Sequence, residues 1–221
     1  MTIGIIDYGM GNLRSVQKGF EKIGAQAKII HRPQQVKDVR AIVLPGVGAF
    51  KNCLENLDAL NLVTPVQKSI AAGKPFLGIC LGLQILFSES TEFGSTPGLD
   101  ILQGKVIRFK PGTAGAKKPG LKIPHMGWNR IAIKKASPHL KDIHEGTYVY
   151  FVHSYYVVPE DDGIVATTTD YGIDFVSSIL KDNIFACQFH PEKSQKTGLK
   201  ILDNFTVFTG QKRRSSYGKD S

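Results

Sequence analysis

The sequence has few cysteines, no long apolar run and no basic leader. Its three cysteines, at 53, 80 and 187, form neither a C-x-x-C pair nor an even, closely spaced set, which excludes a disulfide scaffold and a structural zinc site and indicates a reducing compartment. The longest apolar stretch without a charge, 75–88, is shorter than the roughly 20 residues that span a bilayer. Residues 1–7 lack the basic start of a secretory signal. We expect a cytoplasmic chain with no membrane partner.

Acidic residues are missing from one long segment. The chain has 221 residues and a net charge of +9, yet residues 101–141 carry ten basic side chains and no acidic one, so the rest of the chain is close to neutral. No nucleic-acid-binding motif accompanies this basic strip, defined as residues 101–141, and we expect no nucleic-acid partner. A basic nucleic-acid-binding module remains the more distant alternative.

Hydrophobic residues make up 42% of the chain and charged residues 21%, as in ordinary globular proteins. The length suits one full-sized domain, which we place at residues 1–210, with a disordered basic tail at 211–221. The first half alternates β-rich and amphipathic helical segments, which indicates a largely parallel sheet covered by helices. Strands are predicted at 2–7, 27–30, 41–44 and 76–79, and helices at 12–23, from 48 to about 60, up to 73 and at 81–87.

The second half, from residue 104, is β-rich and punctuated by Gly, Asp and Pro turns, which favours antiparallel strands. These are predicted at 105–109, 128–133, 148–158, 164–169, 175–180 and 184–189, before a last helix at 196–208. The fold class is therefore α/β, with a mixed, largely parallel central sheet flanked by helices and an antiparallel β-rich second half.

The sharpest local motif is G-I-C-L-G at residues 78–82, where a strand ends in a cysteine with glycines two positions before and after it. This is the form of a nucleophile elbow, with Cys80 as the nucleophile on a tight strand-to-helix turn that needs glycines around it. A helix N-terminus beneath the sulfur would favour the thiolate. A small buried cysteine in a glycine-rich turn is the alternative interpretation.

A cysteine nucleophile needs a base and a group that orients the base. The segment Q-F-H-P-E at 188–192 offers both, because in an extended chain His190 and Glu192 project to the same side. The P-G-V-G turn at 45–48 follows the third strand and is placed to direct backbone amides at a developing oxyanion. A surface histidine and an ordinary glycine turn are the simpler alternatives for these two segments.

The glycines at 9 and 11 suggest dinucleotide binding, but Arg14 stands where the third glycine of that fingerprint belongs. Cys53 and Cys187 lie in apolar segments, so we expect both to be packing residues. The remaining histidines are too scattered along the chain to predict a metal site.

Taken in order, the P-G-x-G turn, the cysteine elbow and the H-P-E segment resemble the class I glutamine amidotransferase family. Four motifs, of which the last extends the H-P-E segment, are similar to those of the glutaminase subunits of imidazole glycerol phosphate synthases, which act in histidine biosynthesis. They are D-Y-G-M-G-N at 7–12, P-H-M-G-W-N at 124–129, H-S-Y at 153–155 and H-P-E-K-S at 190–194. The resemblance covers residues 2–209, and it departs from the pattern at Leu83, where methionine is frequent.

This resemblance implies an enzyme that hydrolyses glutamine to glutamate and ammonia without a cofactor or a metal. It implies a catalytic triad of Cys80, His190 and Glu192, in which the cysteine forms a glutamyl thioester. The remaining site residues that it implies are Val47 and Leu81 for the oxyanion hole and Gly48, Gln84, Ser154 and Tyr155 for glutamine.

The resemblance also implies a partner, because ammonia released into water becomes ammonium, which is no nucleophile. The glutaminase fold occupies the whole chain, so a separate cyclase subunit with a (β/α)8 barrel is expected to receive the ammonia through a channel in a heterodimer. The expected interface residues are Tyr8, Asn12, Trp128 and Lys193. The nearer alternative is another class I glutaminase or a γ-glutamyl hydrolase, since the triad is shared.

Overall fold

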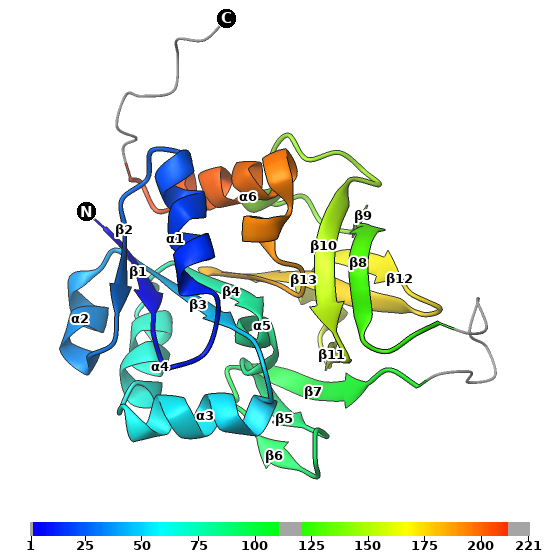
Figure 1. Cartoon of the computed structure of the whole chain (residues 1–221), viewed down its shortest axis with the longest axis horizontal. Helices are drawn as coiled ribbons and strands as arrows, with labels where there is room; N and C mark the ends of the chain where they lie inside the picture. The colour runs from blue at the N-terminus through cyan, green and yellow to red at the C-terminus, as the bar shows by residue number, and fades with distance from the viewer. Residues whose placement is uncertain (1, 111–120, 212–221) are drawn as a thin grey trace, which may run out of the picture.

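The central feature of the fold is a sheet of eight strands in the order β2-β1-β3-β4-β14-β13-β12-β9. The computed structural model describes residues 2–110 and 121–211 (Figure 1). Strands β2, β1, β3, β4 and β14 run parallel, and β13, β12 and β9 continue the sheet antiparallel. The strands are β1 (Ile3–Ile6), β2 (Ala27–Ile30), β3 (Ala41–Gly46), β4 (Phe76–Cys80), β9 (Ala132–Ile133), β12 (Val165–Asp170), β13 (Asp174–Lys181) and β14 (Ile184–Cys187).

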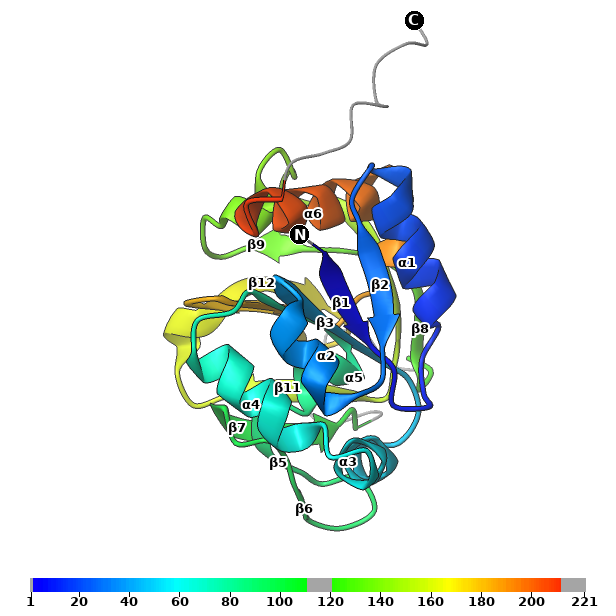
Figure 2. The ribbon, with the colours of Figure 1, turned by 90° about the vertical axis from the view of Figure 1, so that its left-hand side faces the viewer.

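Helices cover both faces of this sheet because its strands are apolar on both sides. In β1, Ile5 faces one hydrophobic cluster and Ile6 the other, as the two-residue period of a strand requires. Figure 2 shows helices α1 and α6 on one face and α2, α3 and α4 on the other. Their bounds are α1 (Leu13–Lys22), α2 (Pro33–Asp38), α3 (Phe50–Ala59), α4 (Val63–Ala71) and α6 (Gln195–Phe208).

Two smaller sheets flank the carboxyl ends of the parallel strands. One has the order β11-β7-β5-β6, and the other pairs β8 with β10. Their strands are β5 (Phe87–Ser90), β6 (Thr96–Pro97), β7 (Leu102–Arg108), β8 (His125–Arg130), β10 (Tyr148–His153) and β11 (Tyr155–Pro159), and the remaining helical turns are α5 (Leu81–Gln84), η1 (Pro138–Leu140), η2 (Asp162–Ile164) and η3 (Pro191–Lys193). The predicted mixed, largely parallel sheet flanked by helices, with an antiparallel second half, is confirmed.

Some predicted boundaries were wrong. The helix predicted at 81–87 ends at Gln84 and the chain enters β5 at Phe87, because a continuous apolar run does not distinguish a buried helix from a buried strand. The strand predicted at 148–158 is two strands that are separated at Ser154. The first, β10, pairs with β8, and the second, β11, pairs with β7. Helix α2 was missed because it is short and buries only Val36.

The tail prediction was wrong at its first residue. Gln211 is buried, and its side-chain amide donates to the carbonyl oxygen of Gln26 at 3.2 Å. Residues 212–221, the rest of the predicted tail, lie outside the described residues. In the described part of the chain, no helix combines the length and the apolarity needed to cross a membrane.

Candidate active site

Cys80 occupies a strained turn between β4 and α5. Its φ of +56° lies in the left-handed region, which non-glycine residues rarely adopt. The turn closes because two glycines allow backbone to touch backbone. A Cβ at Gly78 would lie 2.5 Å from the carbonyl oxygen of Gly82, and a Cβ at Gly82 would collide with that of Leu44. The elbow predicted from the G-x-C-x-G pattern therefore follows from these contacts.

The Cys80 sulfur faces a cavity and the side of strand β10. The thiol lies 3.9 Å from the carbonyl oxygen of Val152, and the Gln188 side-chain amide donates to the sulfur at 3.5 Å. Cys80 is 6% exposed and lines a cavity of about 430 Å³. The sulfur is thus shielded from bulk water and open to a small ligand.

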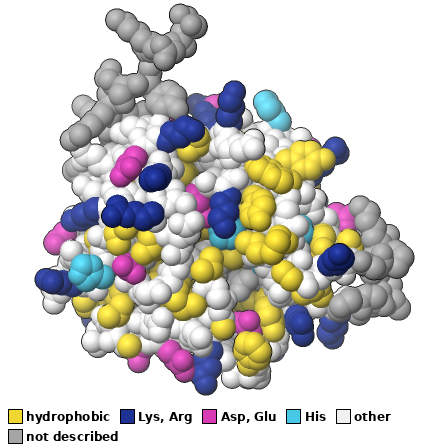
Figure 3. All heavy atoms as spheres, in the orientation of Figure 1, with side chains coloured by type: hydrophobic (Ala, Val, Ile, Leu, Met, Phe, Trp, Pro, Cys, Tyr) yellow, Lys and Arg dark blue, Asp and Glu magenta, His cyan; other side chains and the backbone are white. Residues whose placement is uncertain are grey.

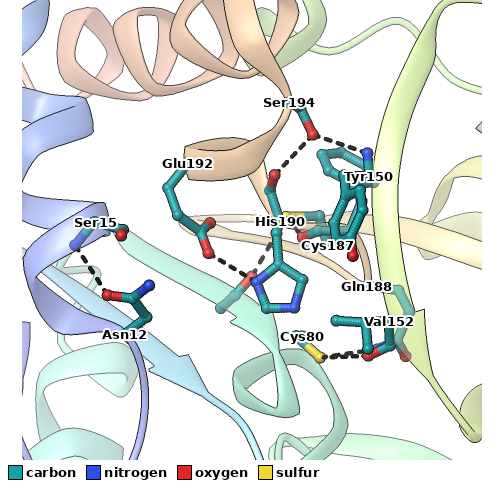
Figure 4. Close-up of polar contacts among 12 residues, drawn as sticks. Asn12, Ser15, Cys80, Tyr150, Val152, Cys187, Gln188, His190, Glu192 and Ser194 are labelled. Carbon is teal, nitrogen blue, oxygen red and sulfur yellow. Dashed lines mark hydrogen bonds and ion pairs between the residues drawn. The ribbon is translucent and has the colours of Figure 1, made fainter. Parts of the chain in front are cut away.

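His190 and Glu192 form a buried pair next to the cysteine. The Nδ1 atom of His190 lies 2.8 Å from Oε1 of Glu192, and the two side chains are 3% and 2% exposed. The contact does not come from an extended segment, as the sequence suggested. Instead Pro191 starts the 3-10 turn η3, which brings the Glu192 carboxylate to the Nδ1 edge of the ring (Figure 4).

Hydrogen bonds fix the backbone of His190 between β10 and α6. Its amide donates to the carbonyl oxygen of Tyr150 at 2.9 Å. The Ser194 hydroxyl donates to the His190 carbonyl oxygen at 2.7 Å and accepts from the Tyr150 amide at 3.0 Å. Because both the amide and the carbonyl group of His190 are hydrogen-bonded, its backbone is fixed and the imidazole has a defined position next to the sulfur.

The charge on His190 is set by its neighbours. Burial opposes the imidazolium, but the Cys80 sulfur and the Glu192 carboxylate outweigh burial and raise the pKa of His190 to about 10. Its Nε2 atom has no hydrogen-bond partner among the described residues, and Figure 4 shows this edge of the ring facing Cys80. A proton on Nε2 therefore stands ready for a leaving group on the cavity side.

The P-G-V-G turn lies next to the elbow, because β3 and β4 are neighbouring strands and Gly46 pairs with Cys80. Val47, Gly48 and Leu81 line the cavity together with Cys80, so the two segments predicted to supply oxyanion donors both border it. Gly48 has a φ of +95°, a conformation that glycine adopts without strain. This set of nucleophile, base and amide donors suits attack on a carbonyl carbon.

Tyr8 holds the turn from below. Its hydroxyl donates to the carbonyl oxygen of Pro45 at 3.0 Å, and a Cβ at Gly46 would collide with the same hydroxyl. Burial raises the pKa of Tyr8, so the hydroxyl keeps its proton and donates. The side chain is 1% exposed and offers no docking surface, contrary to the interface role expected from the sequence.

The predicted glutamine-contact residues all line the cavity. Gln84, Ser154 and Tyr155 line it with Gly48, and the Gln84 amide nitrogen donates to the Tyr155 carbonyl oxygen at 3.0 Å. The same nitrogen donates to Oε1 of Gln188 at 3.0 Å. Gln188 was not predicted as a site residue, although its position two residues before the base was a usable signal.

Glu92 is a lining residue that was not predicted from the sequence. It comes from the loop after β5, and its Oε2 accepts from the Phe50 amide at the start of α3 at 2.6 Å. It is the only acidic residue that lines the cavity in the described part of the chain. No motif surrounds it, so the sequence held no signal for its place. In residues 2–110 and 121–211, no group of three or more His, Cys, Asp or Glu is placed to bind a metal.

Three of the four predicted interface residues are exposed. Asn12 caps α1 through its side chain, and Trp128 is 45% exposed on β8. The Trp128 and Tyr150 rings lie 6.0 Å apart, and the Lys193 ammonium lies 5.7 Å from the Tyr150 ring centre. Figure 3 shows hydrophobic side chains gathered over β8 and β10. Met126 of β8 is 63% exposed. We call this surface beside the cavity, formed by Met126, Trp128, Tyr150 and Lys193, the docking face.

The basic strip is partly engaged with the protein itself. Lys105 pairs with Glu89 at 2.7 Å, Lys135 donates to the Gly163 carbonyl oxygen at 3.0 Å, and the Arg130 guanidinium lies 5.0 Å from the Tyr148 ring centre. Residues 111–120 of the strip lie outside the described residues. The expectation that the strip binds no nucleic acid stays a prediction.

Known proteins match this sequence over nearly its whole length. The family model described as glutamine amidotransferase class-I matches residues 4–208. The imidazole glycerol phosphate synthase subunit HisH of Syntrophotalea carbinolica is 55% identical over 203 residues, which cover 92% of this chain and 98% of that protein. The subunit of the same name from Aquifex aeolicus is 54% identical over 206 residues, with 93% and 96% covered.

Solved structures are similar in fold. A crystal structure of a glutamine amidotransferase matches with a TM-score of 0.72 at 17% identity, covering 95% of this chain and 99% of that one. A structure of PurLQS from Thermotoga maritima matches with a TM-score of 0.71 at 17% identity, covering 94% and 98%. At these identities the likeness concerns the fold alone.

The environments of the three thiols predict a difference in reactivity. Cys53 and Cys187 are fully buried, and burial raises the pKa of Cys53 to about 12 and that of Cys187 well above its usual value. Cys80 faces the cavity beside a cationic ring, which favours reaction with electrophiles. Peptide mapping after brief iodoacetamide treatment of the folded protein at neutral pH should find Cys80 alkylated first. Equal labelling of all three cysteines would remove Cys80 as nucleophile.

Proposed function

The chain belongs to the class I glutamine amidotransferase family, and we propose from this membership and its site that it is the glutaminase subunit of an imidazole glycerol phosphate synthase. Within this family it is an enzyme that releases ammonia from the side-chain amide of glutamine. The observation that carries the proposal is that Cys80, which lines the cavity, interacts with His190, whose ring is paired with Glu192, in a chain whose relatives of that name match it nearly end to end. Residues 1–210 form its glutaminase domain.

The triad divides the reaction into two acyl transfers. The Cys80 thiolate attacks the side-chain carbonyl carbon of glutamine, and the C–N bond breaks as His190 gives its Nε2 proton to the leaving nitrogen. The neutral ring then takes a proton from water, whose oxygen attacks the thioester, and glutamate leaves as the thiolate reforms. Glu192 orients the ring through the 2.8 Å contact and stabilises its charge.

The cavity walls account for the other needs of this substrate. The backbone amides of Val47 and Leu81 stabilise the oxyanion that forms at the carbonyl oxygen. Gly48, Gln84, Ser154 and Tyr155, which line the same cavity, hold glutamine there. The amino-acid end of glutamine carries an ammonium group, and the Glu92 carboxylate at the cavity wall complements that charge.

The second half of the proposal is a partner. Ammonia must reach its acceptor under cover, so this subunit works in the cytoplasm in a heterodimer with a (β/α)8-barrel cyclase that makes imidazole glycerol phosphate and an aminoimidazole carboxamide ribotide. The lyase activity belongs to that complex. Trp128 and Lys193 are proposed contact residues because they belong to the docking face, which is exposed beside the cavity. Asn12 is proposed as a third because it is exposed at the start of α1.

The division of labour between two chains predicts a separable defect. Cys80→Ala should abolish imidazole glycerol phosphate synthesis from glutamine in the complex with the cyclase, since it removes the nucleophile. Synthesis from ammonium salts at high pH should persist, because the cyclase then receives free ammonia from solution. Cys53→Ala removes a core thiol beside Tyr8 and no group of the cavity. As the control it should retain synthesis from ammonium and lose no more of the synthesis from glutamine than Tyr8→Phe does.

Substitution of the other two triad residues should give losses of different size in the same assay. His190→Ala should match Cys80→Ala, because a nucleophile and base that act as a unit are lost together. Glu192→Ala should be milder, since the imidazole remains and loses mainly its orientation. Glutamine-dependent synthesis by Cys80→Ala would refute the mechanism. Glutamine hydrolysis by the wild-type chain without any transfer to the cyclase would favour another class I glutaminase or a γ-glutamyl hydrolase.

The contact beneath the oxyanion turn predicts a positioning role for Tyr8. Tyr8→Phe removes the donor to the Pro45 carbonyl oxygen, so the turn that carries Val47 loosens. Loss of an oxyanion donor lowers kcat by about 10²–10³-fold, and we expect a smaller fall of about tenfold in glutamine hydrolysis, measured by glutamate release. Unfolding should cost about 1 kcal/mol less than in the wild type.

A second readout separates this role from a general loosening of the fold. Alkylation of Cys80 by iodoacetamide needs no oxyanion donor, so its rate in Tyr8→Phe should equal that of the wild type. A parallel fall in alkylation and hydrolysis, or unchanged hydrolysis, would contradict the positioning role.

A further inference from the structure

Two buried histidines lie beside the cavity and have no part in the triad. His125 on β8 and His153 at the end of β10 face each other in register. They are 3% and 6% exposed, and the Nδ1 atom of His125 lies 3.0 Å from the Nε2 atom of His153. His153 also lines the cavity. Their contact links the strand that carries the docking face to the wall that holds glutamine.

The partners of the two rings fix their tautomers. Nδ1 of His153 lies 2.8 Å from the carbonyl oxygen of Tyr155, and a carbonyl oxygen only accepts. The hydrogen of His153 is therefore on Nδ1, which leaves its Nε2 as an acceptor in the neutral ring. The facing Nδ1 of His125 must then carry a hydrogen and donate to it.

The far end of the chain of hydrogen bonds agrees with this assignment. The Asn129 oxygen accepts from the Arg130 amide at 2.8 Å, and its amide nitrogen donates to the Asp170 carbonyl oxygen at 2.9 Å. The same nitrogen lies 3.2 Å from Nε2 of His125. Since this nitrogen is a donor, Nε2 of His125 is an acceptor, as the series of tautomers requires.

Aromatic rings keep both imidazoles neutral. The His125 ring stacks between Tyr171 and Phe151, with centroid distances of 3.9 and 4.8 Å, and Phe109 lies 5.3 Å from the His153 ring. Burial in this cluster lowers the pKa of His125 to about 4 and that of His153 to about 3. Neither ring carries a charge at neutral pH.

At the His153 end, the series of hydrogen bonds continues to Cys80. The Tyr155 carbonyl oxygen accepts from His153 and also from the Gln84 amide nitrogen, which in turn donates to Gln188. The Gln188 amide nitrogen donates to the Cys80 sulfur. Each link is a donor–acceptor pair of one possible direction, so the series from Asn129 to the Tyr155 carbonyl has a single arrangement in the neutral state.

We propose that His125 and His153 are positioning residues for the reaction at Cys80. As two neutral imidazoles of fixed tautomer, they hold the Tyr155 carbonyl where it orients the Gln84 amide, and so they fix the wall against which glutamine lies. The proposal rests on the proposed glutaminase function. It assigns the pair no proton transfer, because in the described part of the chain the hydrogen bonds of both rings go to groups other than the Cys80 sulfur.

Nitrogen NMR on the wild-type protein tests the tautomers directly. In ¹⁵N-histidine protein, two-bond ¹H–¹⁵N correlations distinguish a protonated from a bare ring nitrogen. Both rings should show Nδ1 protonated and Nε2 bare, without change between about pH 8 and about pH 6, because both pKa values lie below this range. Protonation of either ring in this range, or hydrogen on Nε2 of His153, would overturn the proposal.

Variants test the positioning role by activity in the complex with the cyclase. His153→Phe keeps the aromatic packing and removes the donor to Tyr155, so kcat/KM for glutamine should fall about tenfold or more. His153→Asn keeps an amide donor near the place of Nδ1, and it should recover activity to within about threefold of the wild type. Equal loss in the two variants would contradict the proposal.

His139 offers a matched control. It is fully buried, stacks on Phe185 with a centroid distance of 4.7 Å, and neither ring nitrogen has a hydrogen-bond partner among the described residues. His139→Phe should leave kcat/KM for glutamine unchanged, and a loss equal to that of His153→Phe would reduce both to effects on folding.

Failure of the proposed function and failure of the positioning role are distinguishable. A wild-type complex without glutamine hydrolysis would refute the proposed function, and the tautomers measured by NMR would still confirm or overturn the assignment of His125 and His153. Should His153→Phe not fold, the NMR result on the wild-type protein decides the proposal.

Discussion

Cys80 holds a left-handed backbone conformation between a buried strand and a helix, and the contacts around it determine the rest of the site. Such a conformation costs about 1–3 kcal/mol in a non-glycine residue, so the surrounding structure must compensate. The close backbone approaches at Gly78 and Gly82 leave the chain no other path through the elbow. Because the turn is fixed, the sulfur points into the cavity and the Leu81 amide follows it to the same wall.

The charge state of His190 depends on the groups that lie beside it in this site. Burial alone would keep His190 neutral, and it does so for His125, His139 and His153, whose pKa values it lowers to about 4 or 3. His190 is equally enclosed, yet the sulfur and the Glu192 carboxylate raise its pKa to about 10. Similarly buried histidines are therefore neutral at three positions and cationic at His190. The difference comes from the anions beside His190, which stabilise its charged form.

The sequence predicted the parts of the site that lie within short motifs. Gly78, Cys80 and Gly82 have a fixed spacing that only one kind of turn explains, and His190 with Glu192 was found for the same reason. The contact of that pair was predicted from the wrong local structure, because the effect of Pro191 on the following turn was not read from the pattern. The central sheet was predictable since its strands are apolar on both faces, whereas the end of α5 inside a continuous apolar run was not.

Contacts between segments that are distant in the chain could not be predicted from the sequence. Tyr8 was taken for an interface residue, and only its place beneath Pro45 explains its burial.

The most direct test of the role of Cys80 is mass spectrometry of the cyclase complex quenched with acid during turnover of glutamine. A γ-glutamyl thioester is expected on the peptide that contains Cys80, with none on the peptides of Cys53 and Cys187. Turnover with no acyl group on Cys80, or with the group on another residue, would contradict this role.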